Sequence, residues 1–249
     1  MRAAVSFRGR SSCLATRAFI ASLALASFFS MLQGCSAAPP RRDIVVLSPD
    51  GFRLSATVLG KGTRGVLLAH DQAWDKASLG PLAFYLAERG FLVITFNFRG
   101  YPGSDGVPDP SMMDRDVLGA ASALVKNFGA RTVSYVGFGT GALVVAKAAT
   151  SPDFAPRSLG LIGMAREYGP IDMNKVLPEL FLPKVFMVPD GVPSLLSDTE
   201  EAMKLSPQPK EMFVYPADEN WFDPKAAATA ERSGVARLEA FLKQTAKVG

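Results

Sequence analysis

Residues 136–141 have the spacing of a turn that presents a nucleophile, but glycine stands at the centre. In the G-x-S-x-G motif a strand turns sharply into a helix, and the central serine raises its hydroxyl above the sheet. The three alternating positions are here Gly137, Gly139 and Gly141, where the absence of a side chain permits so tight a turn. Gly139 cannot attack a substrate. The sequence therefore predicts the frame of a nucleophile turn without its reagent.

The segments around this turn predict an α/β domain. Residues 132–136 are β-branched and aromatic, as in a buried strand, and residues 141–149 form a helix of small residues. The alternation of strand and helix signals favours a mostly parallel central sheet, with helices on both faces and an N-terminal antiparallel hairpin. The other predicted strands are 44–47, 52–58, 65–69, 91–96, 158–164, 184–188 and 211–215, and the other helices are 79–89, 114–128 and 226–248.

Residues 1–34 have the pattern of a signal peptide. Four arginines precede an uncharged, largely apolar run over residues 18–32, whose 15 residues are too few for a comfortable membrane span. The run is followed by Gly34 and Cys35, and the sequence LQGC resembles the lipobox of bacterial lipoproteins. The resemblance implies a lipid on Cys35, which then becomes the mature N-terminus.

The resulting organisation is a signal peptide, a lipidated Cys35 with a short tether over 35–42, and one domain over 43–249. Ser36 is not the Asp that marks inner-membrane retention in some bacteria, so the resemblance favours an outer-membrane lipoprotein facing the periplasm. Two alternatives remain. An ordinary signal would be cleaved near residues 36–38, or the apolar run would persist as a transmembrane anchor.

Composition excludes several classes of function. Removing the signal takes away four of 27 basic side chains and none of the 23 acidic ones, so the mature chain has no net formal charge. The sequence therefore predicts no nucleic-acid partner. Cys13 lies in the signal, Cys35 at the anchor, and His70 is the one histidine of the chain. We expect no disulfide, no metal site and no cofactor.

Three segments, in this order and spacing, carry a family resemblance. Residues 67–70 (LLAH) look like a strand and loop that supply an oxyanion-hole donor. Residues 96–106 (FNFRGYPGSDG) look like an F-D-x-R-G-Y-G-x-S-x-G loop, and residues 137–141 have the elbow frame. Together they resemble the α/β-hydrolase fold, and in particular small bacterial members related to dienelactone hydrolases and esterases. The likeness covers roughly residues 43–247.

The departures from this family fall on the chemistry. Gly139 occupies the position of the nucleophile. The resemblance places the catalytic histidine after the last strand, where this chain has Asn220, and an amide cannot act as a general base. The acid of the triad would follow residues 184–188, and Asp190 is the nearest carboxylate. The resemblance thus implies a degenerate triad.

Three residues are candidates for an oxyanion loop. His70 and Asp71 end the third predicted strand, and we expect a structural role for His70 rather than a catalytic one. Thr140 follows the centre of the elbow, so its backbone N–H is expected to point into the oxyanion site while its side chain turns away. Asp71 is expected to be a solvated loop charge.

Other polar and aromatic residues are predicted to have ordinary roles. Asp218 and Glu219 are expected to be solvated, and Arg99 is expected to form a structural bridge. Trp74 and Trp221 follow strands at their carboxyl ends, where ligands bind in such sheets, although packing is the simpler role for both.

Three functions are compatible with the sequence. The leading hypothesis is a lipid-anchored, catalytically inactive protein of the bacterial cell envelope that binds a small ligand or an envelope protein. The second is a hydrolase with a non-standard site around His70, Asp71 and Thr140. The third is a structural envelope lipoprotein without a ligand, which a cleft filled by Phe138 or Trp221 would favour.

Overall fold

The computed structural model describes residues 38–221, 223–229 and 232–246. Cys35 and the predicted signal peptide lie outside these residues. The chain divides into two units, Met1–Ala38 and Pro39–Gly249, and the strands and helices below belong to the second. Among the described residues, no helix is both long and apolar enough to cross a membrane.

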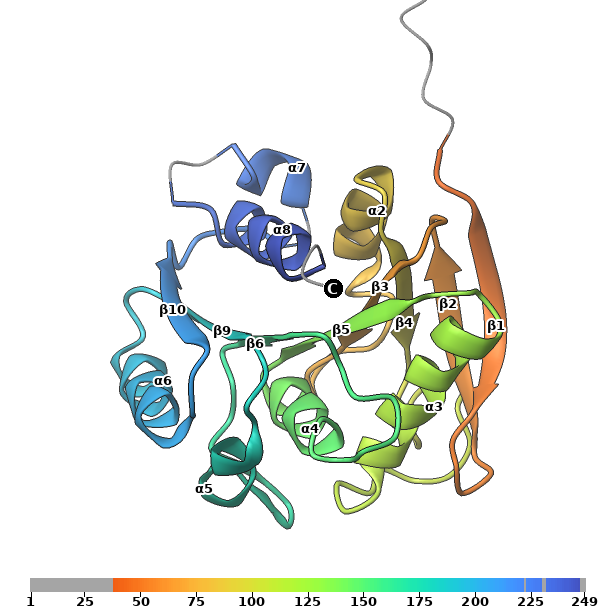
Figure 1. Cartoon of the computed structure of the whole chain (residues 1–249), viewed down its shortest axis with the longest axis horizontal. Helices are drawn as coiled ribbons and strands as arrows, with labels where there is room; N and C mark the ends of the chain where they lie inside the picture. Colours follow the sequence, from red (N-terminus) through yellow and green to blue (C-terminus); the bar gives the residue numbers. More distant parts are fainter. Residues whose placement is uncertain (1–37, 222, 230–231, 247–249) are drawn as a thin grey trace, which may run out of the picture. The chain divides into compact units, whose positions relative to one another are not determined.

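A central sheet of eight strands organises this unit, in the order β1-β2-β4-β3-β5-β6-β9-β10 (Figure 1). A short hairpin, β7-β8, forms a separate sheet. The strands are β1 Arg41–Leu47, β2 Arg53–Leu59, β3 Arg64–Ala69, β4 Leu92–Phe96, β5 Thr132–Phe138, β6 Leu159–Ile162, β7 Glu167–Tyr168, β8 Ile171–Asp172, β9 Lys184–Pro189 and β10 Lys210–Tyr215.

The pairing of the strands is mostly parallel. Every neighbouring pair from β4 to β10 runs parallel, whereas β1-β2 and β2-β4 are antiparallel. Strand β4 is buried along its whole length, as expected for a strand covered on both faces. The predicted parallel sheet with an antiparallel hairpin at its edge is therefore confirmed.

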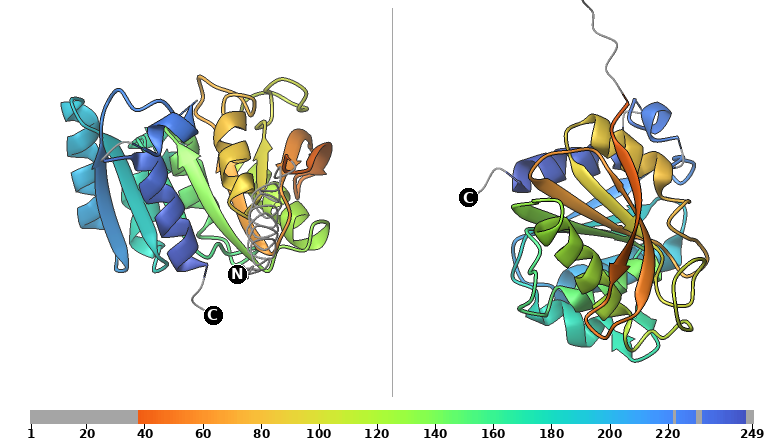
Figure 2. Two further views of the ribbon diagram at one scale, coloured as in Figure 1. Left: turned by 90° about the horizontal axis from the view of Figure 1, so that it is seen from above. Right: turned by 90° about the vertical axis from the view of Figure 1, so that its right-hand side faces the viewer.

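Helices cover the two faces of the sheet (Figures 1 and 2). Helices α2, α7 and α8 enclose one hydrophobic core with the sheet, and α3, α4, α5 and α6 enclose the other. The helices are α2 Gly80–Glu88, α3 Met113–Lys126, α4 Thr140–Ala148, α5 Met173–Val176, α6 Pro193–Leu205, α7 Pro224–Ala227 and α8 Gly234–Thr245, and η1 Leu177–Glu179 is a 3-10 turn.

The elements differ from the sequence analysis in three places. The closing helix is not continuous over 226–248, because Asp223 caps α7 and Ser233 caps a separate helix, α8. Helix α6 and the β7-β8 hairpin were not predicted. Strand β1 begins at Arg41, two residues before the predicted start of the domain at residue 43.

Candidate functional site

The turn between β5 and α4 has the geometry that the glycine spacing predicts. Gly139 has φ 54° and ψ −119°, a backbone conformation that residues with a side chain rarely adopt. A Cβ atom on Gly137 would lie 2.5 Å from the Cα atom of Ala142, and one on Gly141 would lie 2.3 Å from the carbonyl oxygen of His70. The chain can therefore turn sharply from strand to helix only because glycines stand there.

The carboxylate of Asp71 fills the space above Gly139. A Cβ atom built on Gly139 would lie 1.9 Å from Asp71 Oδ2. The same oxygen accepts a hydrogen bond from the backbone N–H of Thr140 at 2.9 Å, and Asp71 Oδ1 accepts one from the N–H of Ala73 at 3.0 Å. Asp71 is therefore not a solvated loop charge, and its carboxylate stands where the side chain of a nucleophile would stand.

The side chain of Thr140 reinforces this contact. Its hydroxyl donates to Asp71 Oδ2 at 3.2 Å and accepts from the backbone N–H of Gln72 at 2.9 Å. The predicted orientation was wrong in this respect, because the side chain faces the loop after β3 instead of turning away. The N–H of Thr140 does point toward the space above Gly139, where it meets a fixed negative charge.

His70 holds the loop that contains Asp71 in place. Its side chain is fully buried. The backbone N–H of Phe98 donates to Nε2 at 3.3 Å, so Nδ1 carries the proton and donates to the carbonyl oxygen of Asp71 at 2.8 Å. The ring also meets Phe98 and Tyr101 edge to face. Burial lowers the pKa of His70, so the neutral imidazole acts as a positioning residue for Asp71.

An aromatic cluster lies beside the turn. The Phe138 ring, one residue before Gly139, packs against Trp74 at 5.7 Å and against Trp221 at 5.4 Å between ring centroids. Trp221 also meets the ring of Tyr215 at 5.5 Å. Trp221 lies in the loop after β10 and is the neighbour of Asn220. Its contact with Phe138 therefore brings this loop against the start of the turn. The simple packing role expected for both tryptophans agrees with this arrangement.

Asp190 lies in the loop after β9. Its backbone N–H donates to the carbonyl oxygen of Tyr215 at 2.7 Å, and its Oδ1 accepts from the N–H of Ala217 at 2.9 Å. Asp190 therefore joins the loops that follow β9 and β10. The structure thus places the positions that the resemblance singles out, Gly139, Asp190 and Asn220, on loops at the carboxyl ends of three parallel strands.

Two tyrosines near Asp71 were not anticipated. The Tyr101 hydroxyl donates to the carbonyl oxygen of Gln72 at 2.9 Å. Burial, the neighbouring Tyr168 and the Asp71 carboxylate raise the pKa of Tyr101 to about 12. Burial and Asp71 also raise the pKa of Tyr168. Tyr168 belongs to the β7-β8 hairpin, and no sequence signal predicted that this hairpin would reach the site.

Glu219 is a helix cap and was wrongly expected to be solvated. Its Oε2 accepts from the backbone N–H of Gly234 at 2.7 Å, and its Oε1 accepts from Val235 at 3.0 Å and from the Ser233 hydroxyl at 2.8 Å. The carboxylate therefore satisfies N–H groups at the first turn of α8, where its negative charge is also favourable.

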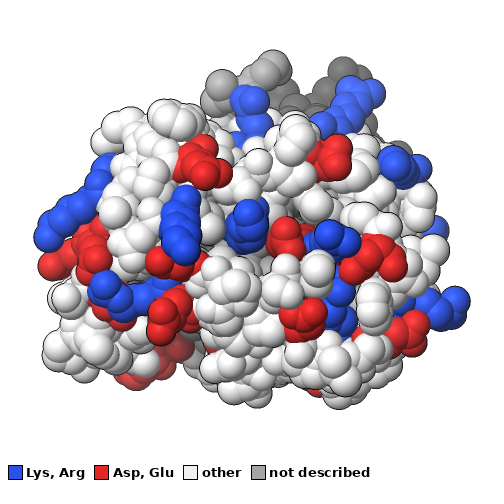
Figure 3. Space-filling view, turned by 90° about the horizontal axis from the view of Figure 1, so that it is seen from below, with Lys and Arg blue, Asp and Glu red and all other residues white. Residues whose placement is uncertain are grey.

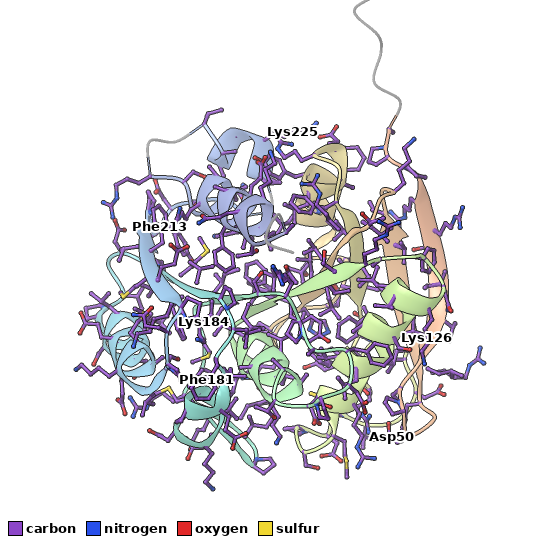
Figure 4. All side chains as sticks on the ribbon, in the orientation of Figure 1. Asp50, Lys126, Phe181, Lys184, Phe213 and Lys225 are labelled. Carbon is purple, nitrogen blue, oxygen red and sulfur yellow. The ribbon has the colours of Figure 1, made fainter. Side chains whose placement is uncertain are left out.

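Arg99 forms the structural bridge that was expected. Its guanidinium contacts Asp116 at 2.6 Å and Asp50 at 2.9 Å, and the side chains of Arg99 and Asp116 are almost fully buried. Hydrogen bonds from Arg99 lower the pKa of Asp50, labelled in Figure 4, to about 2. The cluster links the β1-β2 turn to α3.

Two cavities lie away from the turn. One, of about 410 Å³, is lined by residues at the start of β9 and β10 together with α8, including Lys184, labelled in Figure 4. The other, of about 330 Å³, is lined by residues such as Pro40, Arg42 and Lys61. Within the described residues, no three His, Cys, Asp or Glu side chains gather as a metal site.

Comparison with known proteins establishes the fold. An esterase of Pyrococcus furiosus superposes with a TM-score of 0.71 at 15% identity, covering 84% of this chain and 92% of that one. A dienelactone hydrolase from Anabaena variabilis gives 0.66 at 15% identity over 83% and 96%. A bacterial membrane phospholipase A gives 0.65 at 16% identity over 94% and 96%. The chain therefore has the α/β-hydrolase fold.

Sequence similarity reaches less far. No family model matches the chain. An uncharacterized protein found in two strains of Mycobacterium tuberculosis is 33% identical over 89 residues, which cover 34% of this chain. The matched segment spans about a third of the length of that relative, 32%.

Proposed function

We propose that this protein is a lipid-anchored, non-catalytic α/β-hydrolase-fold protein of the bacterial cell envelope. The observation that carries the proposal is the contact of Asp71 Oδ2 with the backbone N–H of Thr140 at 2.9 Å, directly above Gly139. The carboxylate of Asp71 occupies the place of a nucleophilic side chain. It also accepts the hydrogen bond of the N–H group that would stabilise a reaction intermediate.

A carboxylate at this position opposes acyl transfer. In such reactions preorganised N–H groups point at the oxygen on which negative charge develops. The N–H of Thr140 already binds a negative charge, and a second one close by would be repelled. Gly139 offers no atom for attack, and Asn220 offers no base.

The hydrolase alternative around His70 gains no support from the geometry. Both ring nitrogens of His70 are engaged with backbone groups, at 2.8 Å and 3.3 Å, and the side chain is fully buried. A general base must reach the proton that it abstracts. The contacts of His70 instead support a role in holding the Asp71 loop.

The aromatic cluster favours a function that uses the outer surface. Phe138 is 3% exposed and lies between Trp74 and Trp221. Packing of this kind leaves the turn filled by side chains, the arrangement expected of an envelope protein without a substrate cleft. The anchor itself is supported by the signal pattern and Cys35 in the sequence.

Ester hydrolysis tests the catalytic part of the proposal. Purified wild-type protein and the variants Asp71→Asn and Asp153→Asn are assayed on short-chain p-nitrophenyl esters. Asp153 is exposed and serves as the matched control. We expect all three to remain at the background rate. Turnover by the wild type that Asp71→Asn abolishes and Asp153→Asn preserves would establish the hydrolase alternative instead.

Mass spectrometry of the mature N-terminus tests the anchor. The protein is purified from membranes with detergent, digested, and its N-terminal peptide is analysed. The proposal predicts Cys35 as the first residue, carrying a diacylglyceryl group. An N-terminus within residues 36–40, or an uncleaved N-terminus with a free Cys35 thiol, would refute the lipid anchor.

A further inference from the structure

The edge of the sheet opposite the Gly139 turn carries the start of the domain. Strand β1 is antiparallel to β2, and β2 is antiparallel to β4, so β1 begins where β2 ends and β4 begins. The register pairs Arg64 with Thr132, and therefore the starts of β3 and β5 lie at the same edge. The chain enters the domain at this amino edge of the sheet.

Hydrogen bonds join the loops of this amino edge. The N–H of Gly60 donates to the carbonyl oxygen of Pro40 at 2.9 Å, and the N–H of Arg131 donates to Thr63 at 2.8 Å. The guanidinium of Arg64 reaches the carbonyl oxygen of Gly90 at 3.4 Å. Four separate loops thus form one continuous surface.

Basic side chains dominate this surface. They are Arg42 at the start of β1, Lys61 and Arg131 in these loops, Arg64 at the start of β3, and Lys126 at the end of α3, which Figure 4 labels. None of the five has a carboxylate within ion-pair distance among the described residues.

The acids nearest in sequence to these loops are already paired. Asp43 pairs with Arg41 and lies 3.9 Å from Lys76, and Glu88 pairs with Lys225. On another face of the molecule, by contrast, acidic and basic side chains are interspersed (Figure 3). The amino edge is therefore a basic surface whose cations lack carboxylate partners among the described residues, although Arg42, Arg64 and Lys126 lie over aromatic rings.

A cavity of about 330 Å³ opens within this basic surface. Arg42 at the start of β1 and Lys61 in the loop between β2 and β3 line it, together with Asn127 and Phe128. Two cations and an amide around one hollow suit a phosphate group, which accepts several charge-assisted hydrogen bonds. Pro40, the last residue before β1, belongs to the same lining.

We propose that the amino edge docks on anionic phospholipid, with a lipid phosphate in the cavity between Arg42 and Lys61. The proposal rests on the proposed anchor for its orientation. Six residue steps lead from Cys35 to Arg41, and fully extended they span at most about 22 Å. A lipid on Cys35 would thus hold the membrane close to this edge, and basic residues near a membrane surface attract anionic headgroups.

Fluorescence quenching in reconstituted vesicles tests the docking. A fluorophore is placed on a single cysteine introduced by Thr63→Cys or, as the control, by Ala73→Cys; both positions are exposed and flank opposite ends of β3. With a quencher on the lipid headgroups, we expect severalfold stronger quenching at position 63 than at 73 in vesicles containing phosphatidylglycerol. The difference should vanish in phosphatidylcholine alone. Equal quenching at both positions, or a difference independent of lipid charge, would overturn the proposal.

Charge reversal identifies the residues. Arg42→Glu with Lys61→Glu is compared with Lys175→Glu and Lys204→Glu, an equal change of net charge at exposed positions on α5 and α6. Loss of two cations from the docking edge should lower the ratio of docked to undocked protein at least about thirtyfold. The control pair should leave quenching at position 63 unchanged. Equal effects of the two pairs would contradict the cavity as the site.

Failure of the anchor is distinguished from failure of the docking. An unlipidated Cys35 would take up a second fluorophore, which mass spectrometry detects. The docking is then measured by flotation of the same protein with phosphatidylglycerol vesicles. Flotation that Arg42→Glu with Lys61→Glu abolishes would support the docking surface without an anchor. Absence of flotation at low salt would refute it.

Discussion

The two edges of the central sheet differ in whether their charged side chains have partners within the protein. At the carboxyl edge, Asp71 accepts N–H groups of its own chain and Arg99 is enclosed by Asp50 and Asp116. At the amino edge, cations such as Arg42 and Lys61 have no carboxylate partner within the described residues. Charges satisfied internally fix the structure around them, whereas unpaired surface charges remain available to a partner.

The edge that offers a cavity for a ligand is therefore not the edge at which ligands usually bind in this fold. Ligands of open α/β sheets bind at the carboxyl ends of the strands, where loops meet. In this protein, the Asp71 carboxylate lies against Gly139 at that edge, and the Phe138 ring packs between Trp74 and Trp221. The basic cavity lined by Arg42 and Lys61 lies instead at the amino edge of the sheet.

The largest expected effect is a difference in the free energy of unfolding between substitutions at the two edges. Arg99→Met leaves the buried carboxylate of Asp116 without its partner, and breaking such a pair costs roughly 3–5 kcal/mol of the free energy of unfolding. Lys61→Met at the exposed amino edge should change this free energy by less than about 0.5 kcal/mol. Urea denaturation of both variants measures the contrast, and similar losses for the two would contradict it.

A side chain at the elbow should collide with Asp71. Gly139→Ser places its Cβ atom 1.9 Å from Asp71 Oδ2 and holds it at positive φ, so we expect a loss of roughly 2–5 kcal/mol in the free energy of unfolding. Adding Asp71→Gly should restore roughly 1–3 kcal/mol. Denaturation of the single and double variants measures the coupling free energy between positions 139 and 71.

Gly163 supplies the matched control for this cycle. It has φ +53°, and a Cβ atom at this position would meet no other atom within 4 Å, so Gly163→Ser introduces backbone strain without a collision. Its cost should not depend on Asp71→Gly. If Asp71→Gly rescued both serine variants equally, the collision with Asp71 would not be the cause.

The smallest expected effect is a pH dependence from His70. Burial lowers its pKa below the ordinary value of about 6.5. As pH falls from about 6.5 toward the folded value, the unfolded chain binds a proton that the folded chain does not, so the free energy of unfolding decreases. His70→Asn should remove this slope. Unfolding measured between about pH 7 and about pH 5 tests it, and an unchanged slope in His70→Asn would exclude His70 as its source.

The sequence predicts the parts of the fold that local pattern dictates. Strands β3, β4 and β5 are rich in apolar and β-branched residues, and the glycines at 137, 139 and 141 mark the turn between β5 and α4. Helix α6 was missed although Pro193 stands at its first turn, a favourable start signal. The closing helix was predicted too long because Ala-rich residues conceal the caps at Asp223 and Ser233.

The site depends on contacts that no local pattern reveals. Asp71 and Thr140 lie 69 residues apart in the chain, and their hydrogen bond follows from the course of the loop after β3. The sequence identifies Gly139 as a missing nucleophile but not the carboxylate that replaces it. Tyr168 reaches the neighbourhood of Asp71 only through a hairpin of four paired residues.

Covalent labelling by a fluorophosphonate tests the central claim, that Asp71 closes the turn, most directly. Adducts are measured by mass spectrometry on the wild type, on Gly139→Ser with Asn220→His, and on the same pair with Asp71→Gly. Circular dichroism verifies that each protein is folded. The account predicts no adduct on the wild type, little on the double variant, and clear labelling of the introduced serine only after Asp71→Gly frees its space and the N–H of Thr140. Equal labelling of the double and triple variants, or an adduct on the wild type, would contradict it.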